Sequence, residues 1–319
     1  MVDNGGLLAA SAQVRSERDG EIEARAHVFF RAMQAMGYAA MNVGPHDLMA
    51  GVGFLRKTAR RYHLPLVSAN IVAKKGRKLV FEPWRIAKVG ALKIGLFGLV
   101  SGSPPAYGAR FLDQGLSIEE PIPAAKRAVL ALEEKGCDII VLLSMLKKAE
   151  VEDLAAQVPG VTLIIGSETM DMTMKPQPMG KAFFVGTFMK GKYVAEIVLH
   201  PLDRKDRYVA ANQRAALQSE RADVAREVQS FQSQIDATVG PNAPLQLTPT
   251  TRKQLEQRFA AARARLQRIT LDLEAALPPP NGSSTIDLEM RALGNAVPAD
   301  PKVEGWVKSF QKKYPKKGH

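Results

Sequence analysis

The chain has 319 residues, of which 46% are apolar and 24% charged, as expected of a globular protein with a substantial core. A single cysteine, Cys137, excludes an internal disulfide and leaves no metal-type cysteine spacing. The formal charge of +12 is spread evenly: residues 1–202 carry 25 Lys and Arg against 19 Asp and Glu, and residues 203–319 carry 19 against 13. Because no basic stripe with interleaved aromatic residues stands out, we expect no nucleic-acid partner. No stretch approaches the ~18 apolar residues of a membrane span, so none is predicted.

Short apolar runs alternate with amphipathic helical segments as far as residue 202. The helical segments fall at 21–36, 51–63, 119–135 and 149–158. The apolar runs predict core strands at 38–43, 64–71, 93–100, 138–144 and 161–166. This alternation indicates an α/β fold of stacked layers, with functional sites at the ends of the strands.

Four motifs occur in order along this first part. They read VDNGGLL at 2–8, MGYAAMNVGPHDLMAG at 36–51, DIIVLLSML at 138–146 and VTLIIGSET at 161–169. The series resembles the metallophosphoesterase domain of the 5′-nucleotidase family, whose versions read roughly DxGD, GYDAxxxGNHE, VLLSH and IIGGHSH. LPLVSANIV at 64–72 and GKYVAEIVLHPL at 191–202 resemble two further strands of that domain. The resemblance implies a layered metallophosphoesterase-like sandwich over residues 1–202.

In that family the Asp, Asn and His letters of these motifs bind two metal ions, which activate water for attack on phosphorus. The positions that correspond to metal ligands are occupied here by residues that are poor or impossible ligands for such ions: Gly6, Pro45, Met145, Ser167 and Thr169. We therefore predict a degenerate site with no metal cofactor. The competing hypothesis is an active phosphohydrolase that holds two divalent ions, such as manganese or zinc, in an altered site.

Two residues of the second motif call for separate interpretation. His46 matches the family histidine that stabilises charge on the phosphoryl group, so it is the one candidate catalytic residue; the alternative is an ordinary loop histidine. Asp47 follows it and is expected to cap the next helix. In the first motif, Asp3 matches a family aspartate that is structural rather than a metal ligand.

After residue 202 the pattern changes to heptad-like apolar spacing, over residues 208–236 and 249–277. Gly and Pro separate the two stretches, so 203–277 is predicted to be an antiparallel helical hairpin, with Thr248 or Thr250 capping its second helix. The hairpin could bind a protein partner, associate with a second copy, or pack only on itself. Residues 278–319 are read as a linker and a basic C-terminal tail, with one short helix that places Trp306 and Phe310 on a shared face.

These observations favour a catalytically degenerate 5′-nucleotidase-like domain that serves as a binding or structural component. The family resemblance points to the periplasm or cell envelope, although residues 1–30 do not have the pattern of a signal peptide. MVDNGGLL resembles the end of the family's second strand. We therefore expect the family's first strand, with its DxH metal motif, to lie upstream of Met1 in a longer protein.

Overall fold

A computed structural model describes residues 1–9, 19–102, 113–166, 173, 175–187, 191–200, 208–210, 213–238, 248–275, 284–294 and 297–315. The chain forms two compact units, which are described separately below. The first unit joins Met1–Glu196 to Leu288–His319, and the second is Ile197–Asp287.

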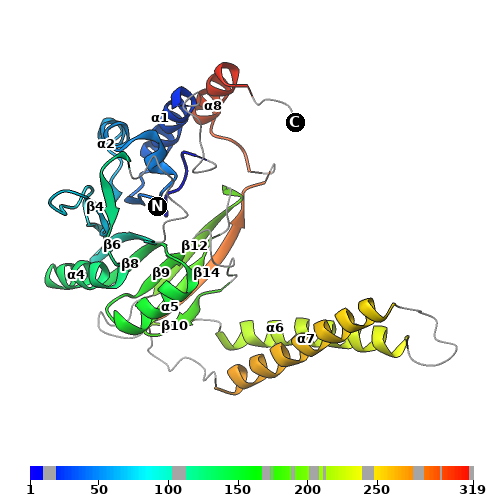
Figure 1. Cartoon of the computed structure of the whole chain (residues 1–319). Helices are drawn as coiled ribbons and strands as arrows, with labels where there is room; N and C mark the ends of the chain where they lie inside the picture. The colour runs from blue at the N-terminus through cyan, green and yellow to red at the C-terminus, as the bar shows by residue number, and fades with distance from the viewer. Residues whose placement is uncertain are drawn as a thin grey trace. The chain divides into compact units, whose positions relative to one another are not determined.

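The first unit is built around a six-stranded sheet in the order β10-β11-β9-β8-β6-β5 (Figure 1). The strands are β5 (Trp84–Val89), β6 (Leu92–Val100), β8 (Ile139–Met145), β9 (Leu163–Gly166), β10 (Gln177–Met179) and β11 (Ala182–Gly186). The four central strands run parallel, and β5 and β10 pair antiparallel at the two edges. A turn at Gly90, where φ is 59°, joins β5 to β6.

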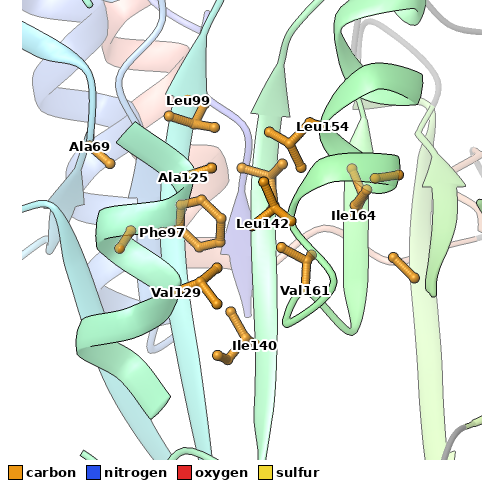
Figure 2. Close-up of a cluster of buried hydrophobic side chains, with 14 of the residues drawn as sticks. Ala69, Phe97, Leu99, Ala125, Val129, Ile140, Leu142, Leu154, Val161 and Ile164 are labelled. Carbon is orange, nitrogen blue, oxygen red and sulfur yellow. The ribbon is translucent and has the colours of Figure 1, made fainter. Parts of the chain in front are cut away.

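Helices α4 (Pro121–Glu134) and α5 (Lys148–Gln157) cover one face of this sheet. Figure 2 shows Leu142 on the central strand, with Phe97 and Ile164 on neighbouring strands and Val129 of α4 beside them. Phe97, Leu142 and Ile164 have no exposed surface. Burying both faces of a parallel sheet requires nearly continuous apolar strands, which explains why β8 is a run of apolar residues rather than an alternating one.

A second, three-stranded parallel sheet has the order β1-β2-β3, with β1 (Val2–Asp3), β2 (Ala40–Asn42) and β3 (Leu66–Val67). Helices α1 (Asp19–Ala35) and α2 (Val52–Arg61) pack against it through a second apolar core that includes Phe30 and Leu55. A short antiparallel pair, β4 (Ile71–Ala73) and β7 (Leu116–Ile118), lies beside this core. The predicted layered α/β fold is confirmed.

The amide of Asn42 joins the two sheets. Its Nδ2 donates to the carbonyl oxygens of Leu99 on β6 and Leu143 on β8, each at 3.1 Å. The side chain reaches them because Gly98 leaves room: a methyl group built at Gly98 would lie 2.1 Å from Asn42 Oδ1. A glycine in the middle of an apolar strand therefore marks the close approach of one sheet to the other.

The second unit contains the helical hairpin of α6 (Gln213–Asp236) and α7 (Pro249–Ala275). Arg265 pairs with Glu220 at 3.0 Å, and Arg258 lies 5.1 Å from the ring of Phe231. These contacts run in opposite directions along the two helices, so the hairpin is antiparallel, as Figure 1 shows. At the start of α7, Thr248 Oγ1 accepts from Thr251 N at 3.2 Å, which confirms the first of the two candidate caps.

The hairpin also serves as a crossover connection. It lies between β13 (Val209–Ala210) and β14 (Thr285–Ala292), which pair in parallel within a sheet of order β12-β14-β13. Parallel strands cannot be joined by a tight turn and need a dozen or more connecting residues. Strand β12 (Tyr193–His200) precedes β13 along the chain and lies at the other edge of this sheet.

The C-terminal helix α8 (Pro301–Lys313) returns to the first unit and packs on α1. Arg31 lies 3.9 Å from the ring centre of Trp306, and Arg25 lies 5.9 Å from that of Phe310. Both rings therefore lie on one face of α8, as predicted, and that face contacts α1. Among the helices described here, none is long and apolar enough to cross a bilayer.

Candidate strand-end site

The motifs meet at the carboxyl ends of parallel strands. Strand β1 leads into the turn at Gly5 and Gly6, and β2 leads into Gly44, Pro45 and His46. Strand β8 ends at Met145, whose carbonyl accepts from Ser101 N at 3.1 Å. This hydrogen bond fixes the backbone at Met145 relative to the end of β6.

The side chain of Met145 occupies the space between the two glycine turns. A methyl group built at Gly44 would lie 2.5 Å from Met145 Sδ and 3.0 Å from its Cε. A methyl group built at Gly6 would lie 3.2 Å from the same Cε. Three positions drawn from three motifs are thus in mutual proximity, and a thioether fills the volume between them. Gly6 also has φ +81°, a conformation that favours glycine.

The carboxylate of Asp47 binds backbone amides of both turns. Its Oδ2 accepts from Gly6 N at 2.7 Å and Gly44 N at 2.9 Å, and its Oδ1 accepts from Leu7 N at 2.9 Å. The prediction that Asp47 caps the next helix was wrong. It is the first residue of the short 3-10 helix η2 (Asp47–Ala50). Its carboxylate has no exposed surface and accepts from Gly44 N nearby and from two backbone amides about forty residues earlier in the chain. The amide of Val52, at the start of α2, donates instead to Gln114 Oε1 at 2.8 Å.

Two carboxyl groups near these turns are weaker acids than usual, with raised pKa values. Burial raises the pKa of Asp47 to about 6, and the amide hydrogen bonds from Gly6, Gly44, Leu7 and Leu8 oppose that rise. Burial likewise raises the pKa of Asp3 to about 6, helped by the nearby charge of Asp47 and opposed by the amide of Gly5. Gly5 N donates to Asp3 Oδ1 at 2.7 Å. Desolvation outweighs hydrogen bonding in both cases.

Two buried amide side chains beside the site have unsatisfied polar atoms. Asn4 is 7% exposed, and neither its Oδ1 nor its Nδ2 has a hydrogen-bond partner among the described residues. Asn42 Oδ1 is also buried without a partner there. Such groups cost roughly 1–3 kcal/mol each unless water or a ligand satisfies them. Sequence reasoning missed both residues, because neither stands at a letter that defines the motifs.

The remaining predicted site residues are placed as follows. Pro45 and His46 are half-buried in the turn after β2. Ser167 and Thr169 lie outside the described residues; Gly166, which precedes them, pairs with Ser144 at the adjacent strand end. Over the part of the chain that the structure describes, no group of three His, Cys, Asp or Glu side chains could hold a metal ion. Gly6 and Pro45 offer no side-chain donor, and Met145 offers only a thioether.

The amino-acid sequence is similar to parts of known nucleotide-hydrolysing proteins. The chain is 27% identical over 158 residues to a 2′,3′-cyclic-nucleotide 2′-phosphodiesterase/3′-nucleotidase of Salmonella typhimurium, covering 45% of this chain and 24% of that protein. It is 24% identical over 207 residues to the trifunctional nucleotide phosphoesterase protein YfkN of Bacillus subtilis, covering 58% of this chain and 14% of that protein. The matched stretch thus spans about a quarter or less of the length of these curated relatives. No family model matches the sequence.

Solved structures agree on the fold. The calcineurin-like phosphoesterase YfkN from Bacillus subtilis superposes with a TM-score of 0.57 at 15% identity, covering 98% of this chain and 82% of that one. A putative 5′-nucleotidase from Staphylococcus aureus gives 0.54 at 13% identity, covering 98% and 49%. Together the sequence and fold comparisons make the chain a distant relative of the 5′-nucleotidases and calcineurin-like metallophosphoesterases.

Proposed function

We propose that the strand-end site no longer binds metal and that the chain acts as a binding or structural component rather than as a hydrolase. The position of the Met145 side chain carries this proposal. Its sulfur and methyl group fill the space between the glycine turns at Gly6 and Gly44. A metal ion there would have to displace them.

The chemistry of the donor set supports the same conclusion. Divalent ions that serve phosphoester hydrolysis require oxygen or imidazole ligands that polarise phosphoryl oxygens and lower the pKa of a bound water. Gly6 and Pro45 supply neither, and the thioether of Met145 prefers soft ions. The residues in place do not fit a two-metal centre.

Asp47 supports the proposal from a second direction. A carboxylate free to bind a metal would need unused oxygen lone pairs aimed into the site. Both Asp47 oxygens accept amide hydrogens, from Gly6, Gly44 and Leu7, so the residue serves the backbone of the turns. This use of Asp47 supports a role in shaping the turns rather than in holding a metal ion.

The hairpin is the element we assign to binding. On α7, Leu255, Ala262 and Ile269 are buried at heptad spacing against α6. Phe259, Leu266 and Leu273, at the neighbouring heptad positions, are only half-buried. A two-helix seam with one half-exposed edge can accept a further helix.

The first test is metal content and hydrolysis. After incubation with manganese or zinc, the purified chain should retain no stoichiometric metal by elemental analysis. It should also show negligible turnover of 3′- and 5′-nucleotides, 2′,3′-cyclic nucleotides and an aryl phosphate. The matched variant Met145→Ala should behave alike, because emptying the space adds no donor. A Leu142→Ala variant, altered in the core away from the site, controls for general loosening of the fold.

A hydrolase with an altered site is the alternative, favoured by the activities named for the relatives. Two bound metal ions per chain, with turnover abolished by His46→Ala, would overturn the proposal and establish that alternative. Metal bound by Met145→Ala but not by the natural chain would mean that the Met145 side chain alone excludes the metal. It would contradict the argument that the surrounding residues lack suitable metal-binding atoms.

The second test concerns the hairpin. Replacing residues 213–275 by a flexible Gly/Ser linker of about 15 residues leaves both β13 and β14 and still allows the parallel crossover. Both tryptophans, Trp84 and Trp306, belong to the first unit, so their fluorescence reports its melting alone. A binding role predicts that concentration-dependent association in sedimentation equilibrium is lost while this melting is unchanged. A lowered melting temperature with no change in association would make the hairpin a brace.

A further inference from the structure

Helix α8 is formed mainly by local signals. Asp300 precedes it, and its Oδ1 accepts from the amides of Lys302 at 2.9 Å and Val303 at 3.0 Å. Pro301 occupies the first helical position, and Lys312 and Lys313 lie in the last turn, where cations favour the helix dipole. A helix with this much end stabilisation depends less than usual on tertiary burial.

The contact of α8 with α1 is shallow. Its inner face consists of Val303, Trp306, Val307, Phe310 and Tyr314, all half-buried, and no residue of the helix is fully buried. Two arginines of α1 lie over the aromatic rings, and Tyr314 Oη donates to Gly20 O at 3.1 Å. Cation–π contacts at exposed positions contribute only about 0.5–1 kcal/mol each.

The opposite face of α8 is basic. Lys302, Lys308, Lys312 and Lys313 are all exposed. Glu304 is the one acidic residue of the helix and pairs with Lys308 at 2.8 Å. Aromatic and aliphatic residues on one face and lysines on the other form the pattern of a helix that lies in a membrane interface.

We propose that α8 exchanges its contact with α1 for an anionic lipid surface. Val303, Trp306 and Phe310 would enter the boundary between headgroups and acyl chains while the lysines remain among anionic headgroups. Release also frees the exposed guanidinium of Arg31 from the ring of Trp306, while Arg25 stays paired with Glu21 at 2.6 Å. Phe29 of the same helix is 37% exposed. A nucleic acid or an acidic protein would need only the lysine face. Only a lipid surface uses both faces of the helix.

The experiment uses the full chain with Trp84→Phe, so that Trp306 is the single fluorescent indole. Vesicles of phosphatidylcholine alone are compared with vesicles that also contain phosphatidylglycerol, by co-sedimentation and by Trp306 emission. We expect binding to the anionic vesicles only, with a blue shift of the emission. Lys308→Gln with Lys312→Gln should weaken binding at least tenfold, since each lysine near such a surface contributes about 1 kcal/mol.

The matched control is Lys74→Gln with Lys75→Gln, two exposed lysines in the turn after β4. It removes the same charge and should leave binding within twofold of the parent. Equal weakening by both pairs, or binding without a Trp306 shift, would reduce the effect to general electrostatic attraction and overturn the proposal. So would absence of binding to anionic vesicles. Trp306→Ala supplies a second arm: it keeps every lysine and should still lose most of the binding.

Discussion

The buried strands of the six-stranded sheet and the turns that follow β1 and β2 carry very different signals in this sequence. In the sheet, the buried apolar runs of β6, β8 and β9 stand in parallel order, with Asn42 tying them to the second sheet. At the strand ends, Gly6, Pro45 and Met145 occupy the positions at which the sequence resemblance predicts metal ligands. The fold remains recognisable although the matched relatives are only 24% and 27% identical. Under the proposed function, the turns keep their backbone arrangement and bind no metal.

The difference has a physical cause. The fold depends on buried apolar area and on backbone hydrogen bonds, neither of which involves the metal ligands. Loss of a ligand therefore leaves the core intact, provided that something else holds the turns together. Asp47 does so through three backbone amides, and Met145 does so by filling the volume between the turns.

The largest expected effect is the removal of that carboxylate. Asp47→Ala leaves the amides of Gly6, Leu7 and Gly44 buried without their acceptor, and each such loss costs roughly 1–3 kcal/mol. We expect the free energy of unfolding of the first unit to fall by about 3 kcal/mol or more, measured by urea denaturation with tryptophan fluorescence.

Asp138→Ala is the matched control. Asp138 Oδ2 also accepts a backbone amide, from Lys93 N at 2.8 Å, but at an exposed position where water can replace it. Its loss should cost less than about 1 kcal/mol. If the two variants are equally stable, the turns are held by packing around Met145 and the comparison between strands and turns needs a different explanation.

The sequence predicted the strands well because their signal is local. Runs such as residues 138–144 are apolar throughout, and a buried parallel strand requires that. The role of Asp47 was not predictable in the same way, since the amides it binds at Gly6 and Leu7 lie about forty positions earlier. The same reason hid the packing of α8 on α1, which joins the two ends of the first unit. Motif matching located Gly6, Pro45 and Met145, but the filling of their shared space by a thioether follows only from coordinates.

A smaller effect should appear in the pH dependence of the first unit. Burial raises the pKa of both Asp3 and Asp47 to about 6, above the value of about 4 expected in the unfolded chain. Between pH 4 and 6 the unfolded state therefore releases protons that the folded state keeps, so these groups make stability fall as pH rises and recover as pH is lowered. A pKa raised by about 2 corresponds to about 3 kcal/mol for one group, and because the two carboxyl groups interact and do not titrate independently, we expect their joint contribution to stay on the order of 3 kcal/mol. Urea unfolding at pH 4, 5, 6 and 7 should show this slope in the natural chain and a reduced one in Asp3→Asn, which removes one group and keeps an acceptor for Gly5 N. Equal slopes in the two proteins would mean that Asp3 is not held in the neutral form near pH 5, and that at this residue the amide of Gly5 outweighs burial.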